Sequence, residues 1–282
     1  FAGDRRRRAR SHPRVAQPAQ LVTTRADRLP QVLTVAPGDL VALVGGGGKT
    51  SLMLALGRAL AASGQRTVLT TTTRIAAYEQ ALAPAVCAPG DEATLAAALA
   101  THGCCLLAQR SGSHKAAGVA PHVPQQLLAR PDVDVVVVEA DGAAQHPVKA
   151  PAQHEPALPY GTTLLIVVAG IDALSAPIAA VAHRPALVAA LTGLAPGDQL
   201  SPQALARLLV HPQGGLKSLP PHARAVVFIN KVEEEQQADL TSMIAVTVLH
   251  GSTVSRVVAG SLQDERRPLL VYTRPGSSHH HD

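Results

Sequence analysis

Short apolar runs alternate along most of the chain with longer stretches that place leucine and alanine at helical spacing. The short runs are rich in valine, leucine, isoleucine and threonine, which is typical of β-strands. This alternation predicts an α/β fold with a mostly parallel sheet and helices on both faces. The predicted strands are 41–44, 66–73, 104–108, 133–138, 163–169 and 225–229, and the predicted helices are one that ends at Ser63 and Gly64 and those at 91–102, 122–129, 186–192, 202–210 and 233–243.

The apolar run 133–138 shows no regular alternation with polar residues. Such a strand is buried on both faces, so we place it at the centre of the sheet. Ligands of open parallel sheets bind beyond the carboxyl ends of the strands. The loops at 110–124, 142–161 and 211–222 are rich in proline, glycine and histidine and longer than connections require, so we expect them to cover a site.

The 282 residues fit one large domain, which we place at 21–270, between a disordered basic tail at 1–20 and a flexible C-terminus at 271–282. Hydrophobic residues make up 46% of the chain and charged residues 16%, which excludes a disordered or fibrous protein. The tail carries six arginines and one aspartate, which equals the whole net charge of +5, so the rest of the chain is neutral. This distribution and the few aromatic residues argue against a nucleic-acid partner.

The chain contains three cysteines, Cys87, Cys104 and Cys105. They are too few for a disulfide framework, and no CxxC spacing indicates zinc. We therefore expect a reducing, cytoplasmic location in which the thiols pack as small hydrophobes. The longest apolar stretches, such as 162–169, are shorter than the roughly 20 residues of a membrane helix, so we expect no membrane partner.

Four glycines followed by lysine, threonine and serine stand between the strand 41–44 and the next helix. Glycine lets backbone amides turn toward a phosphate, the helix start adds positive potential, the lysine supplies a cation and the threonine a hydroxyl for Mg²⁺. The spacing departs from the usual phosphate loop, because Leu43 rather than glycine stands six positions before the lysine. A glycine-rich turn without a ligand is the alternative. The predicted nucleotide-binding residues are Gly45, Gly46, Gly47, Gly48, Lys49, Thr50 and Ser51.

Two carboxylates follow the predicted central strand, where a phosphate-loop protein needs an acidic group near Mg²⁺. Glu139 ends the strand and Asp141 stands in the turn with Gly142. With Thr50, both are candidate Mg²⁺ ligands, and either can position a nucleophile. A plain turn with a capping glutamate is the alternative. The threonines at 70–73 can add hydroxyl ligands, although such a run is also ordinary in strands.

The last predicted strand ends in Asn230, Lys231 and Glu233, a sequence close to the NKxD motif of guanine-specific proteins. In that motif the amide reads the base edge, the lysine lies over the ring and the carboxylate accepts two N–H bonds from guanine. Glu233 moves the carboxylate outward by one methylene, so ATP and GTP both remain candidates. An ordinary solvated strand end is the alternative.

Several motifs in the same order resemble one family, the YqeC-type accessory proteins of selenium-dependent molybdenum hydroxylases. The acidic turn is also similar to that of the maturation GTPases that serve nickel and cobalamin enzymes. The resemblance extends over about residues 20–262. It is carried by the loop 44–50, the strand 69–74, the turn 139–142, the segment 149–156, residues 170–172, residues 183–185, and Asn230 with Lys231.

The resemblance implies a nucleotide-binding protein that acts with Mg²⁺ and ATP or GTP in maturation of such an enzyme. The client hydroxylase or its cofactor-loading protein would be the partner. Carried over by position, Lys49 and Thr50 match the phosphate loop, Glu139 and Asp141 the acidic turn, and Asn230 and Lys231 the base-reading exit. A further family motif without an assigned role matches Lys149, His154 and Glu155.

These features favour a P-loop NTPase in which Lys49 neutralises phosphate charge and Glu139 or Asp141 positions the attacking water. A small-molecule kinase, with an acceptor held by His154, Arg184 or Lys149, is one alternative. A nucleotide-sensing module that docks on the hydroxylase without catalysis is another. The sequence assigns no role to the histidine run at 279–281 and no oligomeric state.

Overall fold

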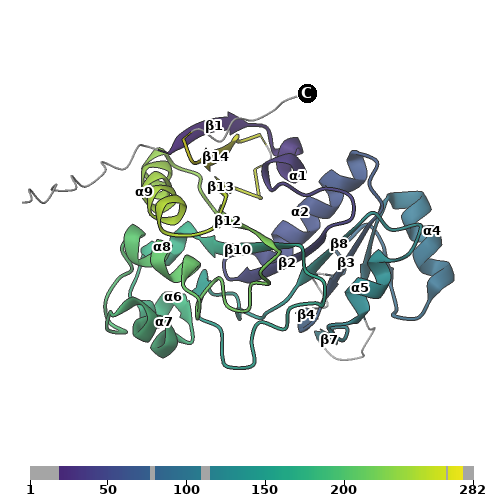
Figure 1. Ribbon diagram of the computed structural model, residues 1–282, viewed down its shortest axis with the longest axis horizontal. Coiled ribbons are helices and arrows are strands. Elements are labelled where there is room, and N and C mark those ends of the chain that lie inside the picture. The colour runs from purple at the N-terminus through teal and green to yellow at the C-terminus, as the bar shows by residue number, and fades with distance from the viewer. Residues whose placement is uncertain (1–18, 77–79, 109–114, 265, 276–282) are drawn as a thin grey trace, which may run out of the picture.

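The computed structural model describes residues 19–76, 80–108, 115–264 and 266–275. Ten strands form one sheet in the order β1-β14-β13-β12-β10-β2-β8-β3-β6-β5 (Figure 1). Neighbouring strands from β13 to β5 are parallel, while β14 is antiparallel to both β13 and β1. The strands are β1 (Gln20–Thr24), β2 (Leu40–Gly45), β3 (Thr67–Thr71), β5 (Val86–Cys87), β6 (Cys104–Leu107), β8 (Val135–Glu139), β10 (Leu164–Gly170), β12 (Arg224–Asn230), β13 (Arg256–Gly260) and β14 (Leu269–Thr273).

Two small ladders lie outside this sheet. β4 (Arg74–Ala76) pairs antiparallel with β7 (Lys115–Ala117). β9 (Val148–Lys149) pairs parallel with β11 (Ala182–His183). This pairing connects the segment after β8 with the segment that precedes α7 (Pro185–Thr192).

Helices cover both faces of the sheet. Buried leucines of α2 pack with alternate residues of β2 such as Leu43, whereas Ala42 and Val44 of the same strand pack with α8 and α9 on the opposite face. Figure 1 shows α6, α7, α8 and α9 grouped at one end of the sheet and α4 with α5 at the other. The helices are η1 (Ala26–Arg28), α1 (Leu29–Val32), α2 (Lys49–Ala62), α4 (Glu92–His102), α5 (Val123–Leu128), η2 (Ile171–Leu174), α6 (Ile178–Val181), α7 (Pro185–Thr192), α8 (Pro202–Val210) and α9 (Glu235–Gly251).

The α/β fold with a mostly parallel sheet and helices on both faces is confirmed. The apolar run 133–138 contributes to β8, which lies between β2 and β3 with every residue buried, as predicted for a central strand. All the predicted strands and helices are present, with shifted ends.

The edge beyond β12 was not predicted. β1, β13 and β14 are additional strands, and β14 continues to Thr273, past the predicted domain end at residue 270. Gln20, which was placed in the basic tail, begins β1. Four of the five residues of β1 are exposed, so this strand lacks the apolar pattern that would reveal it. The rest of the tail, at 1–18, and residues 276–282 lie outside the described residues.

Cys87 of β5 and Cys105 of β6 form a disulfide, so the expectation that all three thiols pack as free hydrophobes is wrong for this pair. The two strands are neighbours in the sheet, a proximity that sequence spacing does not reveal. Cys104 is free and buried, and burial raises the pKa of its thiol to about 12.

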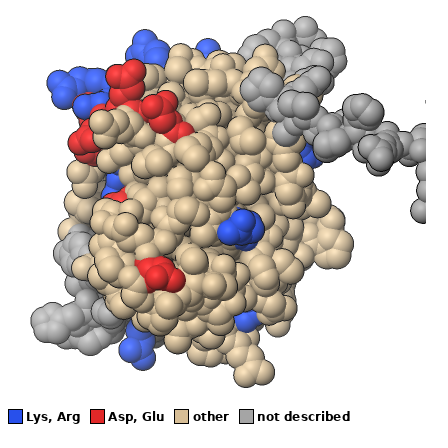
Figure 2. Space-filling view, turned by 90° about the vertical axis from the view of Figure 1, so that its left-hand side faces the viewer, with Lys and Arg blue, Asp and Glu red and all other residues tan. Residues whose placement is uncertain are grey.

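Figure 2 looks onto the side where α7, α8 and α9 lie in Figure 1. Apart from one corner, few charged side chains appear on this face (Figure 2), and α7 contains no charged residue. Within the described ranges, no helix is long and apolar enough to cross a membrane.

Candidate phosphate-loop site

The glycine loop joins the end of β2 to the start of α2. Gly45 and Gly47 have φ angles of 101° and 74°, in the left-handed region that favours glycine. A Cβ atom at Gly45 would lie 2.2 Å from the Val168 carbonyl oxygen, and one at Gly47 would lie 2.1 Å from the Gly170 nitrogen. Both the turn and the packing against β10 therefore require glycine at these positions.

The first residue of α2, Lys49, folds its side chain back over this loop. Its Nζ donates to the Gly45 carbonyl oxygen at 2.6 Å and lies 3.2 Å from Asp141 Oδ1 and 3.8 Å from Glu139 Oε1. Burial lowers the pKa of Lys49, but attraction to Asp141 and Glu139 outweighs it, and the pKa lies above its ordinary value. The loop therefore holds a charged ammonium against its own backbone.

Thr50 and Glu139 meet across neighbouring strands. β8 lies beside β2 with Glu139 opposite Leu43, and Thr50 Oγ1 donates to Glu139 Oε2 at 2.7 Å. Hydroxyl and carboxylate oxygens are ligands that Mg²⁺ takes together with substrate phosphates. No group of three or more His, Cys, Asp or Glu side chains in the described part of the chain can hold a metal ion. The Thr50–Glu139 pair can offer two oxygen ligands to Mg²⁺ that arrives with a nucleotide.

Asp141 supports the loop from beneath. Its Oδ2 accepts a hydrogen bond from the Gly45 N–H at 3.1 Å and lies 3.2 Å from Lys149 Nζ. The side chain is 2% exposed, and Asp141 does not line the cavity over the loop, whereas Glu139 does. Of the two predicted carboxylates, Glu139 is therefore the one placed to meet a ligand in that cavity.

A chain of ion pairs continues from Asp141 through the segment of the third family motif. Lys149 Nζ donates to Glu155 Oε2 at 2.8 Å and to the Gly142 carbonyl oxygen at 2.7 Å. Arg184 donates to both oxygens of Glu155, at 2.6 and 3.1 Å. Burial raises the pKa of Glu155, but hydrogen bonds from Lys149, the Ala152 N–H and Arg184 outweigh it and lower the pKa to about 2. Glu155 is therefore ionised and fully engaged.

A cavity of about 790 Å³ opens over the loop at the carboxyl edge of the sheet. The loop 142–161 contributes to its wall, as predicted, whereas Lys217 of the loop 211–222 instead donates to the carbonyl oxygens of Ala152 and Gln153. Part of the predicted loop 110–124, residues 110–114, lies outside the described residues. The cavity is lined by residues 47–51, 73–74, 139, 142–146, 155, 183 and 231.

Two cavity histidines, His146 and His183, were not identified as site residues from the sequence. Their ring centroids are 6.0 Å apart, and His146 Nδ1 lies 3.0 Å from the Ala144 carbonyl oxygen. Burial and the positive charges of Arg184 and Lys149 lower the pKa of His183. The β9–β11 ladder brings His183 beside Lys149, and this non-local pairing leaves no spacing signal in the sequence. His154, the histidine that the sequence did single out, is exposed and does not line this cavity.

Most threonines of the run 70–73, which begins within β3, form hydrogen bonds inside the fold. Thr70 Oγ1 donates to the Leu107 carbonyl oxygen at 2.8 Å, and Thr71 Oγ1 donates to the Glu139 carbonyl oxygen at 2.9 Å. Thr72 Oγ1 donates to the Ala157 carbonyl oxygen at 2.7 Å. Of the run, only Thr73 lines the cavity, so it is the threonine placed to offer a hydroxyl to a ligand.

The predicted base-reading residues make three different kinds of contact in the structure. Asn230 is buried, and its Nδ2 donates to the Gly47 carbonyl oxygen at 2.8 Å, so its amide secures the loop. Lys231 lines the cavity and pairs with Asp172 at 2.6 Å. Glu233 accepts a hydrogen bond from Ser261 Oγ at 2.8 Å. Base recognition by this segment remains a prediction.

Two buried oxygens near the loop, Asp172 Oδ1 and Asn230 Oδ1, lack a hydrogen-bond partner among the described residues, whereas Asp141 Oδ1 lies 3.2 Å from the Lys49 ammonium. Neither Asp172 nor Asn230 lines the cavity, and both oxygens can only accept hydrogen bonds, so neither is placed to meet a phosphate there.

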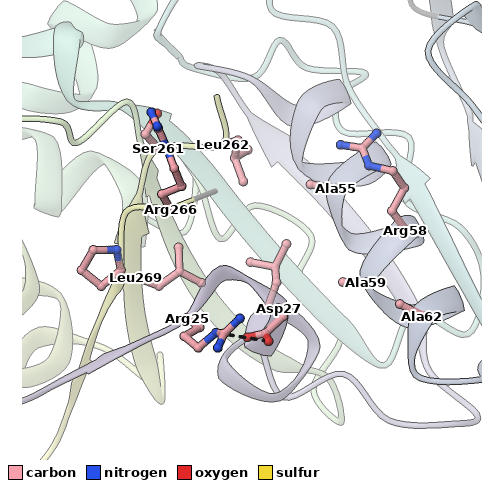
Figure 3. Close-up of a pocket in the computed structure, with 12 residues that line it drawn as sticks. Arg25, Asp27, Ala55, Arg58, Ala59, Ala62, Ser261, Leu262, Arg266 and Leu269 are labelled. Atoms are coloured by element: carbon pink, nitrogen blue, oxygen red, sulfur yellow. Dashed lines mark ion pairs between the residues drawn. The ribbon is translucent and has the colours of Figure 1, made fainter. Parts of the chain in front are cut away.

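A second cavity, of about 580 Å³, lies between α2 and the connection from β13 to β14 (Figure 3). Ala55 and Arg58 of α2 line one side, and Arg25 forms an ion pair with Asp27 near its lower end. Ser261, which holds Glu233, belongs to the opposite wall. None of the predicted site residues lines this cavity.

The model of the family described as YqeC protein matches residues 41–186 of this chain. The protein of Escherichia coli strain K12 described as uncharacterized protein YqeC is 34% identical over 228 residues, which cover 80% of this chain and 88% of that protein. A crystal structure of the signal recognition particle receptor FtsY from Elizabethkingia anophelis covers 86% of this chain and 67% of its own, at 10% identity and a TM-score of 0.36, a likeness too low to bear on function. On the family match and the identity to the Escherichia coli protein, the chain belongs to the YqeC family.

Proposed function

We propose that this protein is a nucleoside triphosphatase that binds ATP or GTP with Mg²⁺ over its glycine loop. The observation that carries this proposal is the hydrogen bond from Thr50 to Glu139 at 2.7 Å, directly beside the buried cation of Lys49. It joins a hydroxyl at the start of α2 to a carboxylate at the end of the adjacent strand, within one cavity. That combination matches what binding of Mg²⁺ and a triphosphate requires.

Each residue then has a role set by its position. Lys49 exchanges its contacts with Gly45 and Asp141 for contacts with the β- and γ-phosphates, while Asp141 keeps its hold on the Gly45 N–H. Thr50 and Glu139 hold Mg²⁺, which when bound offsets charge that develops on the phosphate oxygens. Glu139 also orients the attacking water, because Asp141 lies outside the cavity.

The second part of the proposal is a role in the maturation of another enzyme. From the motif resemblance we infer a role as an accessory or maturation factor for selenium-dependent molybdenum hydroxylases, with the client enzyme or its cofactor-loading protein as partner. Nucleotide hydrolysis would then reset the state of the protein after delivery to that partner.

Isothermal titration with Mg-ATP and Mg-GTP tests the nucleotide site. Wild-type protein should bind at least one of them, Lys49→Ala should lose binding, and Lys217→Ala, which changes a lysine outside the cavity, should bind like wild type. A tenfold preference for GTP would support base recognition by Asn230, Lys231 and Glu233. Absence of binding to correctly folded wild-type protein would refute the proposal.

A small-molecule kinase is a second candidate, because the cavity extends from the loop to His146 and His183 and leaves a polar region beyond the phosphates. The two candidates differ in one measurement. Phosphate release without an added acceptor supports hydrolysis, whereas nucleotide consumption that requires an acceptor supports the kinase.

A further inference from the structure

We propose that Arg74 is a catalytic residue of this site whose guanidinium contacts the γ-phosphate and stabilises its charge during phosphoryl transfer. This inference rests on the proposed nucleotide site and adds a residue to which neither the motif analysis nor the family match gives a role. Arg74 lines the same cavity as Lys49, Thr50 and Glu139.

The register of the sheet places Arg74 beyond the catalytic edge. Thr71 of β3 lies opposite Glu139 of β8, and Glu139 lies opposite Leu43 of β2, so these three residues stand at one level. All three strands run in the same direction. Past this level the chain after β2 forms the glycine loop, and the chain after β3 reaches Arg74. The two segments therefore leave the sheet on the same side, where the end of a triphosphate bound by the loop would lie.

The backbone that carries Arg74 is held in place. The Thr71 hydroxyl and the Thr72 N–H both donate to the Glu139 carbonyl oxygen, at 2.9 and 3.1 Å. The Thr73 carbonyl oxygen accepts the Gly118 N–H at 2.6 Å, and Arg74 itself pairs with Ala117 in the β4–β7 ladder. The backbone that leads to Arg74 is thus held by Glu139, whose side chain contacts Thr50.

Unlike Lys49 and Lys231, Arg74 has no acidic partner among the described residues. Lys49 pairs with Asp141, and Lys231 pairs with Asp172. Arg74 is exposed and has no ion pair or hydrogen bond through its side chain within the described part of the chain. Its guanidinium can therefore bind phosphate oxygens without first breaking another interaction, and its planar donors match phosphate geometry.

The step itself is an in-line displacement. The oxygen of the attacking water forms a bond to the γ-phosphorus, and the bond from that phosphorus to the bridging oxygen breaks with its electron pair leaving on the nucleoside diphosphate. The proton of the water passes to the released phosphate. Arg74 neither gains nor loses a proton, and it acts by offsetting negative charge that develops on the transferred group.

The test compares Arg74→Ala and Arg74→Lys with Arg207→Ala, which removes an exposed arginine from α8. With the nucleotide that wild type prefers, kcat of Arg74→Ala should fall about 100-fold or more, because donors to a transferring phosphoryl group act mainly in the transition state. Affinity for the nucleoside diphosphate should stay within about twofold, and Arg74→Lys should retain part of the rate. Added guanidinium ion should partly restore the rate of Arg74→Ala.

A second measurement does not require turnover. Nucleoside diphosphate with Mg²⁺ and aluminium fluoride, which imitates the transferring phosphoryl group, should form a tight complex with wild type and a weak one with Arg74→Ala.

The outcomes separate the two proposals. If wild type binds no nucleotide, the proposed function fails, and this inference fails with it. If wild type turns over and folded Arg74→Ala keeps its kcat, only the role of Arg74 is refuted. If wild type binds nucleotide but shows neither turnover nor a fluoride complex, the role of Arg74 is also refuted, while nucleotide binding stands.

Discussion

Lys149 is a buried cation between two carboxylates, and its ammonium lies 3.2 Å from Asp141 Oδ2 and 2.8 Å from Glu155 Oε2. Removing one member of a buried ion pair leaves a charge without compensation, which typically costs more than the intact pair contributes. The stability of this part of the site therefore depends on Lys149, Asp141 and Glu155 together and not on any single ion pair.

We expect Lys149→Met to lower the free energy of unfolding by about 3 kcal/mol, because two buried carboxylates lose a shared cation. Urea denaturation measures the change, and Lys217→Met provides a control at a lysine with backbone contacts only. The double variant Lys149→Met with Asp141→Asn should recover part of the loss. A change below about 0.5 kcal/mol in the single variant would show that the network is not stabilising.

Glu155 predicts a pH dependence of stability. Its pKa is about 2 in the folded protein, below the ordinary 4.5, so its contribution is complete above pH 4.5. As pH falls from about 4.5 towards about 2, the unfolded chain binds the proton first, and the contribution is lost. The stability difference between wild type and Glu155→Gln should shrink across this window in urea titrations at successive pH values. A difference that stays constant through the window would contradict the assignment.

At the scale of residues, the sequence located groups at the carboxyl edge of the sheet, both at the end of a strand and at the start of the helix that follows one. Lys49, Thr50 and Glu139 were predictable because the carboxyl ends of neighbouring parallel strands share one edge. The engagement of Asn230 with the Gly47 carbonyl oxygen was not, because it depends on the packing of loops distant in sequence.

At the scale of elements, the glycine loop is specified by two separate constraints, backbone conformation and contact with β10. The structure offers a comparison that isolates the second constraint. Gly64, after α2, has a φ of 85° and open space around its missing Cβ, whereas Gly47 has a φ of 74° and a backbone nitrogen 2.1 Å from that position.

We therefore expect Gly64→Ala to cost about 1 to 2 kcal/mol, the price of a left-handed conformation alone. Gly47→Ala should cost more and should also abolish nucleotide binding, because the loop must move away from β10. Thermal unfolding and nucleotide titration measure both effects. Equal costs for the two variants, with binding retained in Gly47→Ala, would show that the contact with β10 is easily relaxed.

The strands that the sequence predicted have a strong apolar pattern, although β13 and β14, which are also apolar and mostly buried, were missed. β8 and β10 are buried along their whole length, and their valine-rich sequences indicate this directly. β1 is mostly exposed, so its position is set by its pairing with β14. The disulfide between Cys87 and Cys105 likewise depends on strand order, which periodicity does not encode.

At the scale of the whole molecule, the net charge of +5 is concentrated at one end of the sequence. Deleting residues 1–18 removes six arginines and one aspartate, so the net charge should fall to zero. We expect the shortened chain to lose retention on a heparin column and to keep its unfolding free energy within about 0.5 kcal/mol. Unchanged retention would place the polyanion-binding surface elsewhere.

The ion-pair chain through the site has a consequence for how a ligand arrives. Lys49, Lys149 and Arg184 face Glu139, Asp141 and Glu155, so the opposing charges of this chain are equal in number. A balanced set of charges projects little field beyond the surface, and electrostatic steering requires such a field. Among the described residues of this cavity, the unpaired charge of Arg74 is therefore the main source of such a field, so the rate at which nucleotide arrives should fall with added salt and should lose most of that dependence in Arg74→Ala. Selection at this site rests on fit to the loop after contact.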